Sequence, residues 1–157
     1  MEIRFAREGD IPKIIDLLYQ VGQVHYDLRP DVFRPVTLKY DHEQVLAILQ
    51  DENRPVFIAA EDDEVLGFGF CVIKPIRNHS VVQDMTEFYI DDLCVDENHR
   101  SQGIGEALYR HIHAHAKALG CRAVTLNVWN CNSRALKFYE KLGLMPQRLY
   151  MEDVLGE

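Results

Sequence analysis

Apolar residues recur every three to four positions in several segments of the chain, which is the spacing of helices that bury one face. The expected helices, in chain order, are one from Ile11, one over 41–50, one over 103–119 and a short one after Asn132. Asp10 is expected to cap the first helix and Gly120 to end the third. The side chains expected to face a core share the helical spacing: Ile14, Ile15, Leu17, Leu18 and Val21; Val45, Leu46 and Leu49; Ile104, Leu108, Ile112 and Leu119.

Apolar and polar residues alternate in other segments, and this period of two predicts strands with one buried face. The expected strands, in chain order, are 2–7, 55–61, 65–73, 86–95, 123–128 and 147–154. Residues 62–64 join two of them as a hairpin, whereas Pro30 and Pro35 prevent a continuous helix through 25–39. Antiparallel strands followed by a strand–helix–strand crossover predict an α/β fold, in which a mixed sheet has helices on both faces.

Composition narrows the class of protein. A length of 157 residues suits one core, so we expect a single domain over 1–157. The net charge of -8 argues against general binding to nucleic acid or to an anionic membrane. The four cysteines form no paired motif, which predicts reduced thiols. Residues 1–8 do not resemble a signal peptide, and the longest apolar run, 65–73, is too short to span a bilayer, so a cytoplasmic protein is expected.

The segment 91–108 leads from an apolar strand through a short polar turn into a long amphipathic helix. Arg100, Gly103 and Gly105 form the pattern Arg-x-x-Gly-x-Gly at this turn. Glycines let a ligand approach the main chain, and the unpaired first amides of a helix attract an anion, so the pattern predicts a phosphate site. Leu108 stands where a dinucleotide-binding fingerprint has its third glycine, and no Gly-Lys-Ser/Thr triplet of a Walker loop occurs.

A second pattern, Asn-x-x-Ala-x-x-Phe-Tyr-x-Lys-x-Gly, begins at Asn132 and ends at Gly143. Together the two patterns resemble motifs A and B of the GNAT superfamily of N-acetyltransferases. The resemblance implies a mostly antiparallel sheet whose two central parallel strands splay apart, with acetyl-CoA as co-substrate. It also implies transfer of the acetyl group to a primary amine of a small molecule or protein, by direct attack in a ternary complex.

Two other interpretations stay open on the sequence alone. A catalytically silent module that binds acyl-CoA would keep both motifs, although the intact Tyr139 favours catalysis. An unrelated α/β interaction domain would carry both motifs by chance. Many members of the family are dimers, but nothing in the sequence locates an interface, so a homodimer is also left open.

The resemblance assigns roles to individual residues. The Leu93 amide is expected to stabilise the oxyanion, and Val95 to bond the pantetheine arm. Tyr139 is expected to protonate the leaving thiolate, for which a phenol is a suitable donor. Asn132 is expected to contact the coenzyme arm while it also caps its helix. The residues expected to line the coenzyme are Leu93, Cys94, Val95, Arg100, Ser101, Gln102, Gly103, Ile104, Gly105, Glu106, Asn132 and Tyr139.

The general base is less well defined by the sequence. Glu87, Asp91 and Asp92 all lie on the strand that precedes the glycine turn. Strand alternation places Glu87 and Asp91 on one face and Asp92 on the other, unless a bulge intervenes. Glu87 and Asp91 are the candidates. The family uses no single position for this role and often works through a water chain, and Tyr89 occupies the position of its best-known glutamate.

The acceptor site is expected in the segment after the first helix, which varies within the family. Tyr26, Asp27, Asp31 and Phe33 would hold a cation there by charge and aromatic contact. Cys94 has no histidine beside it in the sequence and is expected to be a buried structural thiol.

Three histidines crowd the long helix, and two of them have the spacing of metal ligands. His111 and His115 are four positions apart, but the sequence around them lacks the glutamate of a zinc protease. Together with His113 they are expected to form a solvated helix face, and no metal is expected.

Overall fold

The computed structural model describes residues 1–35 and 38–156. Residues 36, 37 and 157 belong to the expected irregular stretch 25–39 and to the end of the expected domain, and they lie outside the described residues. The chain divides into two compact units, Met1–Asn127 and Val128–Glu157. Among the described residues, no helix has both the length and the apolar character needed to cross a membrane.

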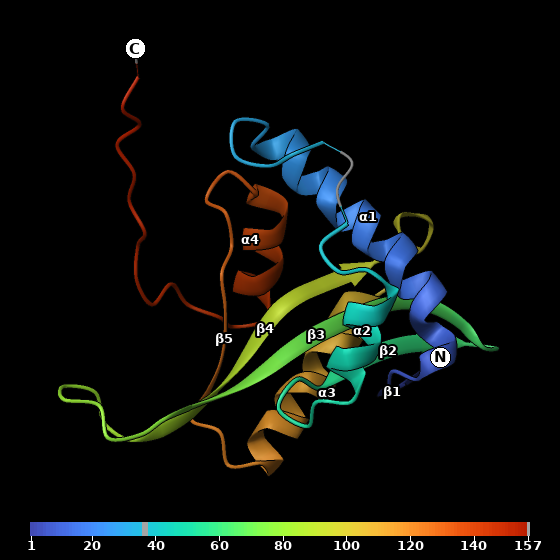
Figure 1. Cartoon of the computed structure of the whole chain (residues 1–157), viewed down its shortest axis with the longest axis horizontal. Coiled ribbons are helices and arrows are strands. Elements are labelled where there is room, and N and C mark those ends of the chain that lie inside the picture. Colours follow the sequence, from blue (N-terminus) through green and yellow to red (C-terminus); the bar gives the residue numbers. More distant parts are fainter. Residues whose placement is uncertain (36–37, 157) are drawn as a thin grey trace. The chain divides into compact units, whose positions relative to one another are not determined.

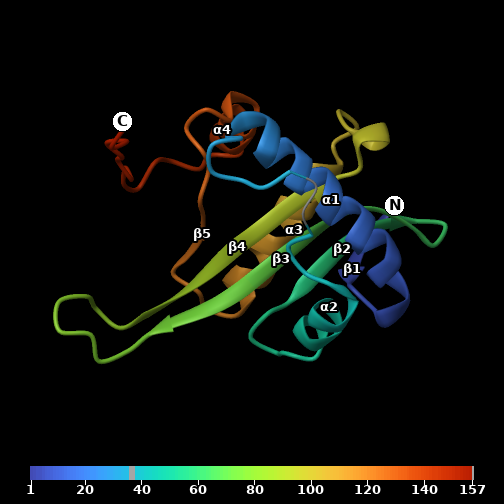
Figure 2. The ribbon, with the colours of Figure 1, turned by 45° about the horizontal axis from the view of Figure 1, so that its top comes forward.

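The first unit is built on a mixed sheet whose described strands have the order β1-β2-β3-β4-β5 (Figure 2). The strands are β1 (Glu2–Phe5), β2 (Val56–Glu61), β3 (Glu64–Ile76), β4 (Met85–Val95) and β5 (Ala123–Leu126). Neighbouring strands are antiparallel except for β4 and β5, which are parallel. The helix α3 (Ile104–Ala118) forms the crossover between these two strands, as the strand–helix–strand pattern predicts.

Helices cover both faces of this sheet, which confirms the expected fold class. Figures 1 and 2 show α1 (Ile11–Leu28) and α2 (His42–Leu49) on one face and α3 on the other. Short 3-10 turns lie before α1 (Glu8–Asp10) and after β4 (Glu97–His99). The largest fully buried side chains come from the sheet and from all three helices: Phe57, Phe68, Phe70, Phe88, Ile11, Ile14, Leu17, Leu18, Ile58, Leu108, Ile112 and Val45.

The parallel strands β4 and β5 stay together over only part of their length. Their pairing extends from Glu87 to Ile90 of β4 and stops there. On its other side β4 continues to pair with β3 as far as Val95. Among the described residues, the stretch 91–95 therefore has β3 on one side and no strand on the other. This is the splay that the resemblance implies.

A bulge interrupts β4 where this splay begins. The register shifts between Phe70 and Cys71 of β3, and Asp91 is the extra residue on β4. The two sides of the bulge face opposite layers, although a regular strand would put all even-numbered positions on one face. Phe88 contacts α3 before the bulge, whereas the Cys94 thiol contacts α1 after it.

The predicted cap of α1 is wrong in its detail. Asp10 precedes α1, but its side chain makes no capping hydrogen bond to the helix. Its carboxylate instead accepts hydrogen bonds from the Arg4 guanidinium at 2.8 and 3.0 Å and from the Arg7 amide at 2.7 Å. Asp10 lies in a 3-10 turn, where its backbone is already helical, so the carboxylate closes that turn and joins it to β1.

In α2 and α3 the residues that face the core differ in part from those predicted. In α2, Ile48 is buried, while Leu46 and Leu49 are partly buried at the margin of the core. In α3, Leu119 is 52% exposed, and Ala116 is the last buried residue. Leu119 follows the end of the helix at Ala118, so it no longer shares the inward face.

The second unit consists of α4 (Ser133–Lys141) and the extended segment that follows it (Figure 1). Asn132 caps α4 as expected, because its Oδ1 accepts a hydrogen bond from the Ala135 amide at 3.1 Å. Gly143, with φ of 93°, follows the helix end. The strand expected over 147–154 is not present among the described residues, and that prediction is wrong. Strand-like composition does not supply the neighbouring backbone that a strand needs for its hydrogen bonds.

Candidate active site

In the described sheet, residues 91–95 of β4 pair with β3 on one side only, so their other backbone edge is open in the middle of the sheet. The predicted residues Leu93 and Val95 lie on this open edge. Leu93 pairs with Gly69 of β3, and both Leu93 and Val95 are half-buried. An extended ligand along this edge would meet main-chain groups that a neighbouring strand would otherwise use. The side chain of Cys94 lies in the core, with Sγ 3.7 Å from the Leu17 carbonyl oxygen. Burial raises the pKa of this thiol to about 12, which fits an inert structural cysteine.

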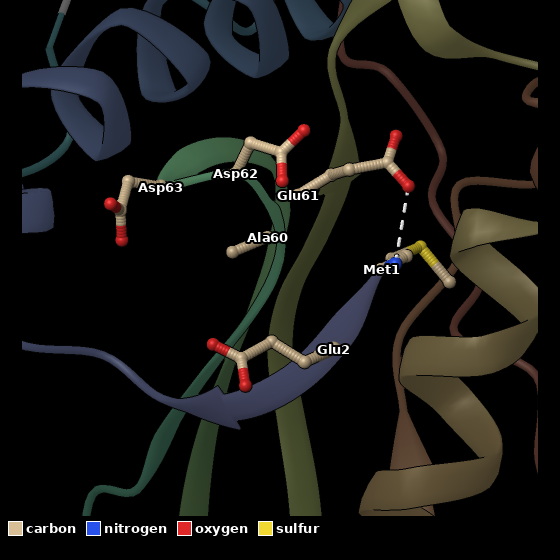
Figure 3. Close-up of a pocket in the computed structure, with 6 residues that line it drawn as sticks. All are labelled: Met1, Glu2, Ala60, Glu61, Asp62 and Asp63. Atoms are coloured by element: carbon tan, nitrogen blue, oxygen red, sulfur yellow. Dashed lines mark hydrogen bonds and ion pairs between the residues drawn. The ribbon is translucent and has the colours of Figure 1, made fainter.

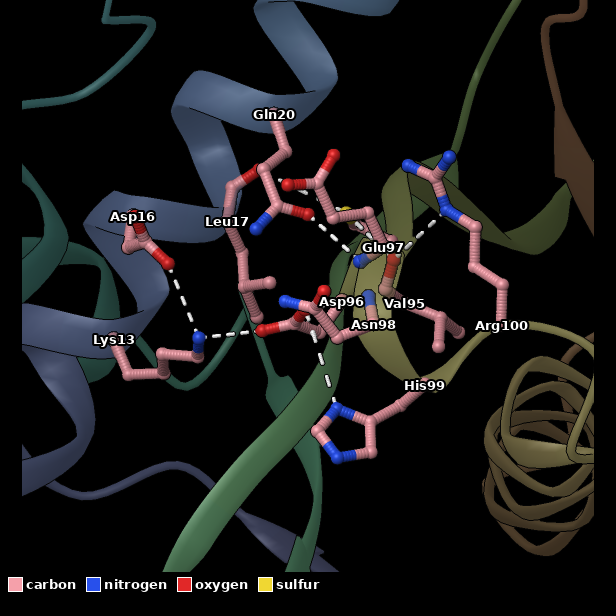
Figure 4. Close-up of polar contacts among 11 residues, drawn as sticks. Lys13, Asp16, Leu17, Gln20, Val95, Asp96, Glu97, Asn98, His99 and Arg100 are labelled. Atoms are coloured by element: carbon pink, nitrogen blue, oxygen red, sulfur yellow. Dashed lines mark hydrogen bonds and ion pairs between the residues drawn. The ribbon is translucent and has the colours of Figure 1, made fainter.

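The buried carboxylate of Asp96 ties the turn after β4 to α1 (Figure 4). It accepts a hydrogen bond from the Asn98 amide at 3.0 Å and forms an ion pair with Lys13 Nζ. The Gln20 side chain accepts a hydrogen bond from the Glu97 amide at 3.0 Å. Burial by itself would raise the pKa of Asp96, but hydrogen bonds from Lys13 and Asn98 outweigh it and lower the pKa. The turn that leads into the glycine pattern is therefore fixed in place.

We expect Asp96→Asn to lower the free energy of unfolding by about 2 kcal/mol at neutral pH, because it removes the charge that holds Lys13. The folded pKa of Asp96 lies below the unfolded value of about 3.9, so its contribution is complete above that value. It is lost as the pH falls through the folded pKa. Urea unfolding at pH 7 and at pH 3 should therefore show a smaller difference between variant and wild type at pH 3.

The exposed partner of the same lysine supplies a control for this prediction. Asp16 lies 3.1 Å from Lys13, but its side chain is 58% exposed. Asp16→Asn should change stability by less than about 0.5 kcal/mol, as exposed ion pairs do. Equal losses from both variants, or a loss from Asp96→Asn that does not depend on pH, would contradict the role given to the buried pair.

The glycine pattern forms a left-handed turn at the start of α3. Ser101 has φ of 63° and Gly103 has φ of 80°. A Cβ at Gly103 would meet nothing within 4 Å, so the space beside it is open. No side chain caps α3, and its first amides, beginning with Ile104, are directed out of the helix end. This geometry suits a phosphate group.

Arg100 lies directly before this turn. Its Nε donates a hydrogen bond to the Val95 carbonyl at 3.4 Å, and Figure 4 shows its guanidinium apart from Asp96 and Lys13. Glu106, in the first turn of α3, accepts hydrogen bonds from Arg110 at 2.8 and 2.9 Å. The remaining predicted coenzyme residues of this segment lie in the turn or at the start of α3: Ser101, Gln102, Ile104 and Gly105.

The bulge in β4 brings Asp91 and Asp92 to one ammonium group. Lys39 Nζ lies 3.0 Å from Asp91 Oδ2 and 2.6 Å from Asp92 Oδ2. The Tyr40 hydroxyl donates to Asp91 at 3.1 Å and accepts from Arg54 at 3.1 Å. Alternation had placed the two aspartates on opposite faces, and the extra residue of the bulge is the reason that they converge.

Asp91 and Asp92 form an acidic pair, in which Asp92 is the more deeply buried residue. Burial raises the pKa of Asp92, and the attraction of Lys39 offsets this only in part. Burial alone would lower the pKa of Lys39, but Asp92 and then Asp91 outweigh it and raise the pKa. At neutral pH the pair therefore holds a protonated amine. Glu87 lies on the part of β4 that is still paired with β5, away from the open stretch.

Two of the residues expected to bind the acceptor have partners of their own. Asp27 Oδ1 accepts a hydrogen bond from Gln23 at 2.7 Å. Asp31 forms a two-fold ion pair with Arg29, with distances of 2.9 and 2.7 Å. The charge of Asp31 is thus balanced locally, which makes it a poor site for a second cation.

The other two residues expected to bind the acceptor, Tyr26 and Phe33, are aromatic. Phe33 stacks on His25, with ring centroids 5.0 Å apart. Burial lowers the pKa of His25, the charge of Asp92 acts in the opposite direction, and the charge of Lys39 lowers the pKa further. Tyr26 is half-buried next to His25 on α1. Phe33 therefore contacts α1 through the ring of His25.

The sequence pattern did not single out four residues of this region: Lys39, Tyr40, Arg54 and His25. The first three lie in the irregular segments on either side of α2, where no periodic pattern marks a functional residue. The available signal was the aspartate pair itself, since adjacent buried carboxylates require a cation nearby.

The histidines of α3 do not form a wholly solvated face, so that prediction is wrong in part. His115 packs against Phe57 and Phe88, with ring centroids 5.1 and 5.8 Å away, and His111 packs against Phe57 at 5.3 Å. Burial lowers the pKa of His115. The aromatic surface of the sheet beneath α3 explains this packing. Within the described part of the chain, no group of three or more candidate ligands is placed to hold a metal ion.

The motif B residues belong to the second unit. Tyr139 is half-buried on α4, with its ring centroid 5.1 Å from that of Phe138. The cap uses the side-chain oxygen of Asn132, so its side-chain nitrogen is not needed for that purpose. The roles of Tyr139 and Asn132 toward a coenzyme stay predictions.

A hollow of about 460 Å³ lies at the β1 side of the sheet, across from β4 and β5 (Figure 3). It is lined by Met1, Glu2, Ala60, Glu61, Asp62 and Asp63. The terminal ammonium of Met1 pairs with Glu61 at 3.1 Å. None of the predicted coenzyme or acceptor residues lines this hollow, so it is not a candidate for the active site.

The splayed strands β4 and β5 and the glycine turn before α3 have the arrangement that the resemblance to the acetyltransferases implies. The family model described as the acetyltransferase (GNAT) family matches residues 22–144, and the chain belongs to this family.

Similar proteins of known activity are N-acetyltransferases. The chain is 30% identical over 95 residues to L-ornithine N5-acetyltransferase NATA1 of Arabidopsis thaliana, covering 60% of this chain but only 41% of that protein. It is 26% identical over 151 residues to the thialysine N-epsilon-acetyltransferase of Bos taurus, covering 90% of this chain and 82% of that protein. A solved structure of a mutant BH1408 protein from Bacillus halodurans is 30% identical, with a TM-score of 0.94 over 99% of both chains.

Proposed function

We propose that the protein transfers an acetyl group from acetyl-CoA to a primary amine of a small cationic molecule, by direct attack in a ternary complex. Membership of the family supports acetyl transfer, and ornithine and thialysine, named for two relatives, are amines of this kind. The observation that carries the choice of acceptor is the ammonium group of Lys39, bound by Asp91 and Asp92. This cation lies beside Leu93, whose amide is the proposed oxyanion donor.

The Lys39 ammonium marks where the acceptor would bind. Lys39 lies in the connection between α1 and α2, and its side chain is 42% exposed, so it is able to move aside. An acceptor ammonium that takes its place would leave the charge of the site unchanged. Its cost of desolvation would be offset by the same two carboxylates.

The coenzyme would lie along the open part of β4. The first amides of α3 and Arg100 would hold the pyrophosphate, and the free edge of Leu93 to Val95 would pair with the pantetheine arm. This arrangement brings the thioester to the residue that follows the acidic pair. Hydrogen-bond donors that are held in place stabilise the developing oxyanion more strongly in such a site than in water.

The chemistry then needs three proton transfers. One carboxylate of the acidic pair takes a proton from the acceptor ammonium, and the raised pKa of Asp92 suits it to that role. The amine attacks the thioester carbon, and the Leu93 amide stabilises the oxyanion. The carbon–sulfur bond breaks as Tyr139 gives its proton to the sulfur, and the second proton of the nitrogen returns through water to Tyr139. The products are an amide, a free thiol and one proton.

We expect Lys39→Met to strengthen the binding of a cationic amine about tenfold, because the competing ammonium is gone. Without a ligand the variant should melt at a lower temperature, since it leaves Asp92 buried and unpaired. Adding 1,5-diaminopentane should restore more of its melting temperature than it adds to the wild type. Lys39→Arg keeps the cation and serves as the control. An equal effect of the diamine on all three proteins would place the acceptor elsewhere.

Arg100→Ala should weaken the binding of CoA by about tenfold, or 1.4 kcal/mol, because the guanidinium would contact the pyrophosphate. The affinity for a pantetheine fragment should not change, since the fragment lacks that group. Arg110→Ala, on the exposed side of α3, should leave both affinities unchanged. Calorimetry measures all of these, and equal losses for CoA and pantetheine would mean that Arg100 only shapes the turn.

The proposal as a whole is tested by thiol release from acetyl-CoA in the presence of single amines. The panel should include ornithine, thialysine, an uncharged primary amine and a lysine-containing peptide. We expect the highest kcat/KM with a small cationic amine. Preference for the peptide would assign a protein acceptor, and binding of acetyl-CoA without thiol release would assign the silent coenzyme-binding module.

A further inference from the structure

The amine of Lys39 occupies the place that the proposed function gives to the acceptor. Its Nζ lies 2.6 Å from Asp92 Oδ2 and 3.0 Å from Asp91 Oδ2. Like the proposed acceptors, it is a primary amine at the end of a flexible apolar chain. Leu93, whose amide is the proposed oxyanion donor, follows Asp92 directly. When acetyl-CoA is bound, this amine would therefore meet the same chemistry as a free acceptor.

The backbone on both sides of Lys39 is anchored to the first unit. Leu38 and Tyr40 are partly buried and pack against its core. The Tyr40 ring lies 5.8 Å from that of Phe70 between centroids, and its hydroxyl donates to Asp91 at 3.1 Å. A nucleophile held in this way reacts within one molecule, and such proximity replaces a high concentration of a free reactant.

We propose that the protein acetylates its own Lys39 when acetyl-CoA is bound and no acceptor amine is present. This inference rests on the proposed function, because it uses the same coenzyme, the same acidic pair and the same oxyanion donor. It adds a site of covalent modification in the connection between α1 and α2, and a means by which the acceptor site is regulated.

The reaction balances with the groups already present. A carboxylate of the acidic pair takes one proton from the Lys39 ammonium, and the neutral nitrogen attacks the thioester carbon. A carbon–nitrogen bond forms, and the carbon–sulfur bond breaks with its electron pair leaving on sulfur. The thiolate takes up a proton, and the nitrogen loses its second proton to water. The products are N-acetyl-lysine, the free thiol of CoA and one proton.

Acetylation would open the acceptor site. An acetylated Lys39 is neutral, so it no longer balances the charges of Asp91 and Asp92. The side chain of Asp92 is only 7% exposed, and a buried carboxylate without a cation is costly. A cationic amine would then bind to the acidic pair without first displacing the lysine. The modified protein should therefore bind 1,5-diaminopentane more tightly than the unmodified protein.

Lys13 provides an internal comparison for Lys39 (Figure 4). It also pairs with a buried carboxylate, that of Asp96, and with the exposed carboxylate of Asp16. The side chains of Lys13 and Lys39 are 33% and 42% exposed, so their access to acetyl-CoA in solution differs little. Faster modification of Lys39 would therefore report its place at the acidic pair and not its exposure.

Peptide mass spectrometry of the full chain after incubation with labelled acetyl-CoA tests the proposal. We expect label on Lys39 to appear at least about ten times faster than on Lys13. Its rate constant should not depend on protein concentration, since each chain modifies itself. Asp91→Asn should slow it at least about tenfold, whereas the matched control Asp16→Asn should leave it unchanged. An excess of 1,5-diaminopentane should also slow it, because the diamine competes for the acidic pair.

The proposal is overturned if Lys39 is labelled no faster than Lys13, or if its rate constant rises with protein concentration. Labelling that neither Asp91→Asn nor the diamine slows would overturn it as well. The samples with the diamine separate this proposal from the proposed function. Labelled N-acetyl diamine, with Lys39 unlabelled even when the diamine is omitted, overturns self-acetylation alone. Absence of label from both the diamine and Lys39 overturns both proposals.

Discussion

Tyr139→Phe is expected to lower kcat on the order of a hundredfold, which is the usual scale for the loss of a general acid. The substitution removes one hydroxyl group and keeps the ring, so the contact with Phe138 on α4 should survive. The KM for acetyl-CoA should change little, because the hydroxyl would act on the thiolate only as the carbon–sulfur bond breaks. Steady-state kinetics with the preferred amine measures both constants.

Tyr150→Phe provides a matched control for this experiment. It removes the same hydroxyl from the same unit, but Tyr150 is fully exposed, so its kinetics should equal those of the wild type. A Tyr139→Phe enzyme with full kcat would assign the proton to water or to another group. Loss of kcat together with a proportional rise in KM would make Tyr139 a binding residue.

Asp91→Asn is expected to lower kcat/KM for a cationic amine by about a hundredfold. The amide keeps the shape of the side chain but removes one of the two charges around the acceptor ammonium. Asp92→Asn should also unfold more easily, because Asp92 is buried against Lys39 and Asp91 is less so. Kinetic and unfolding measurements on both variants therefore separate binding from folding.

Glu87→Gln decides between the two carboxylates that the strand pattern indicated. Glu87 lies where β4 and β5 are still paired, so we expect its removal to cost far less than removal of Asp91. A large loss from Glu87→Gln with an active Asp91→Asn enzyme would return the general base to Glu87. It would also contradict the proposal that the acceptor amine binds in place of the Lys39 ammonium.

Most of the fold was predictable because it follows from short-range patterns. The helical and strand periods locate β4, α3 and β5, and the Arg-x-x-Gly-x-Gly turn between them requires the left-handed Gly103 that the structure contains. The parallel pairing of β4 and β5 follows from the crossover through α3. These features depend on residues close together in the sequence.

The errors arise where the outcome depends on distant partners. A bulge at Asp91 is set by the register of β3 against β4, and alternation along one strand cannot reveal it. Lys39 reaches Asp92 across 53 positions of the sequence. The segment 147–154 has the composition of a strand, but pairing requires a neighbour that composition does not identify. The contact of Lys39 with Asp91 and Asp92 could therefore not be predicted from the sequence.

The central claim is that the acetyl group of acetyl-CoA reaches the nitrogen of a small cationic amine at the acidic pair of β4. Mass spectrometry after incubation with acetyl-CoA labelled in its acetyl group tests it most directly. We predict labelled N-acetyl amine in an amount equal to the free CoA, and little of it with Asp91→Asn at the same enzyme concentration. Free CoA without labelled amine, or equal labelling by the wild type and the Asp91→Asn variant, would contradict the claim.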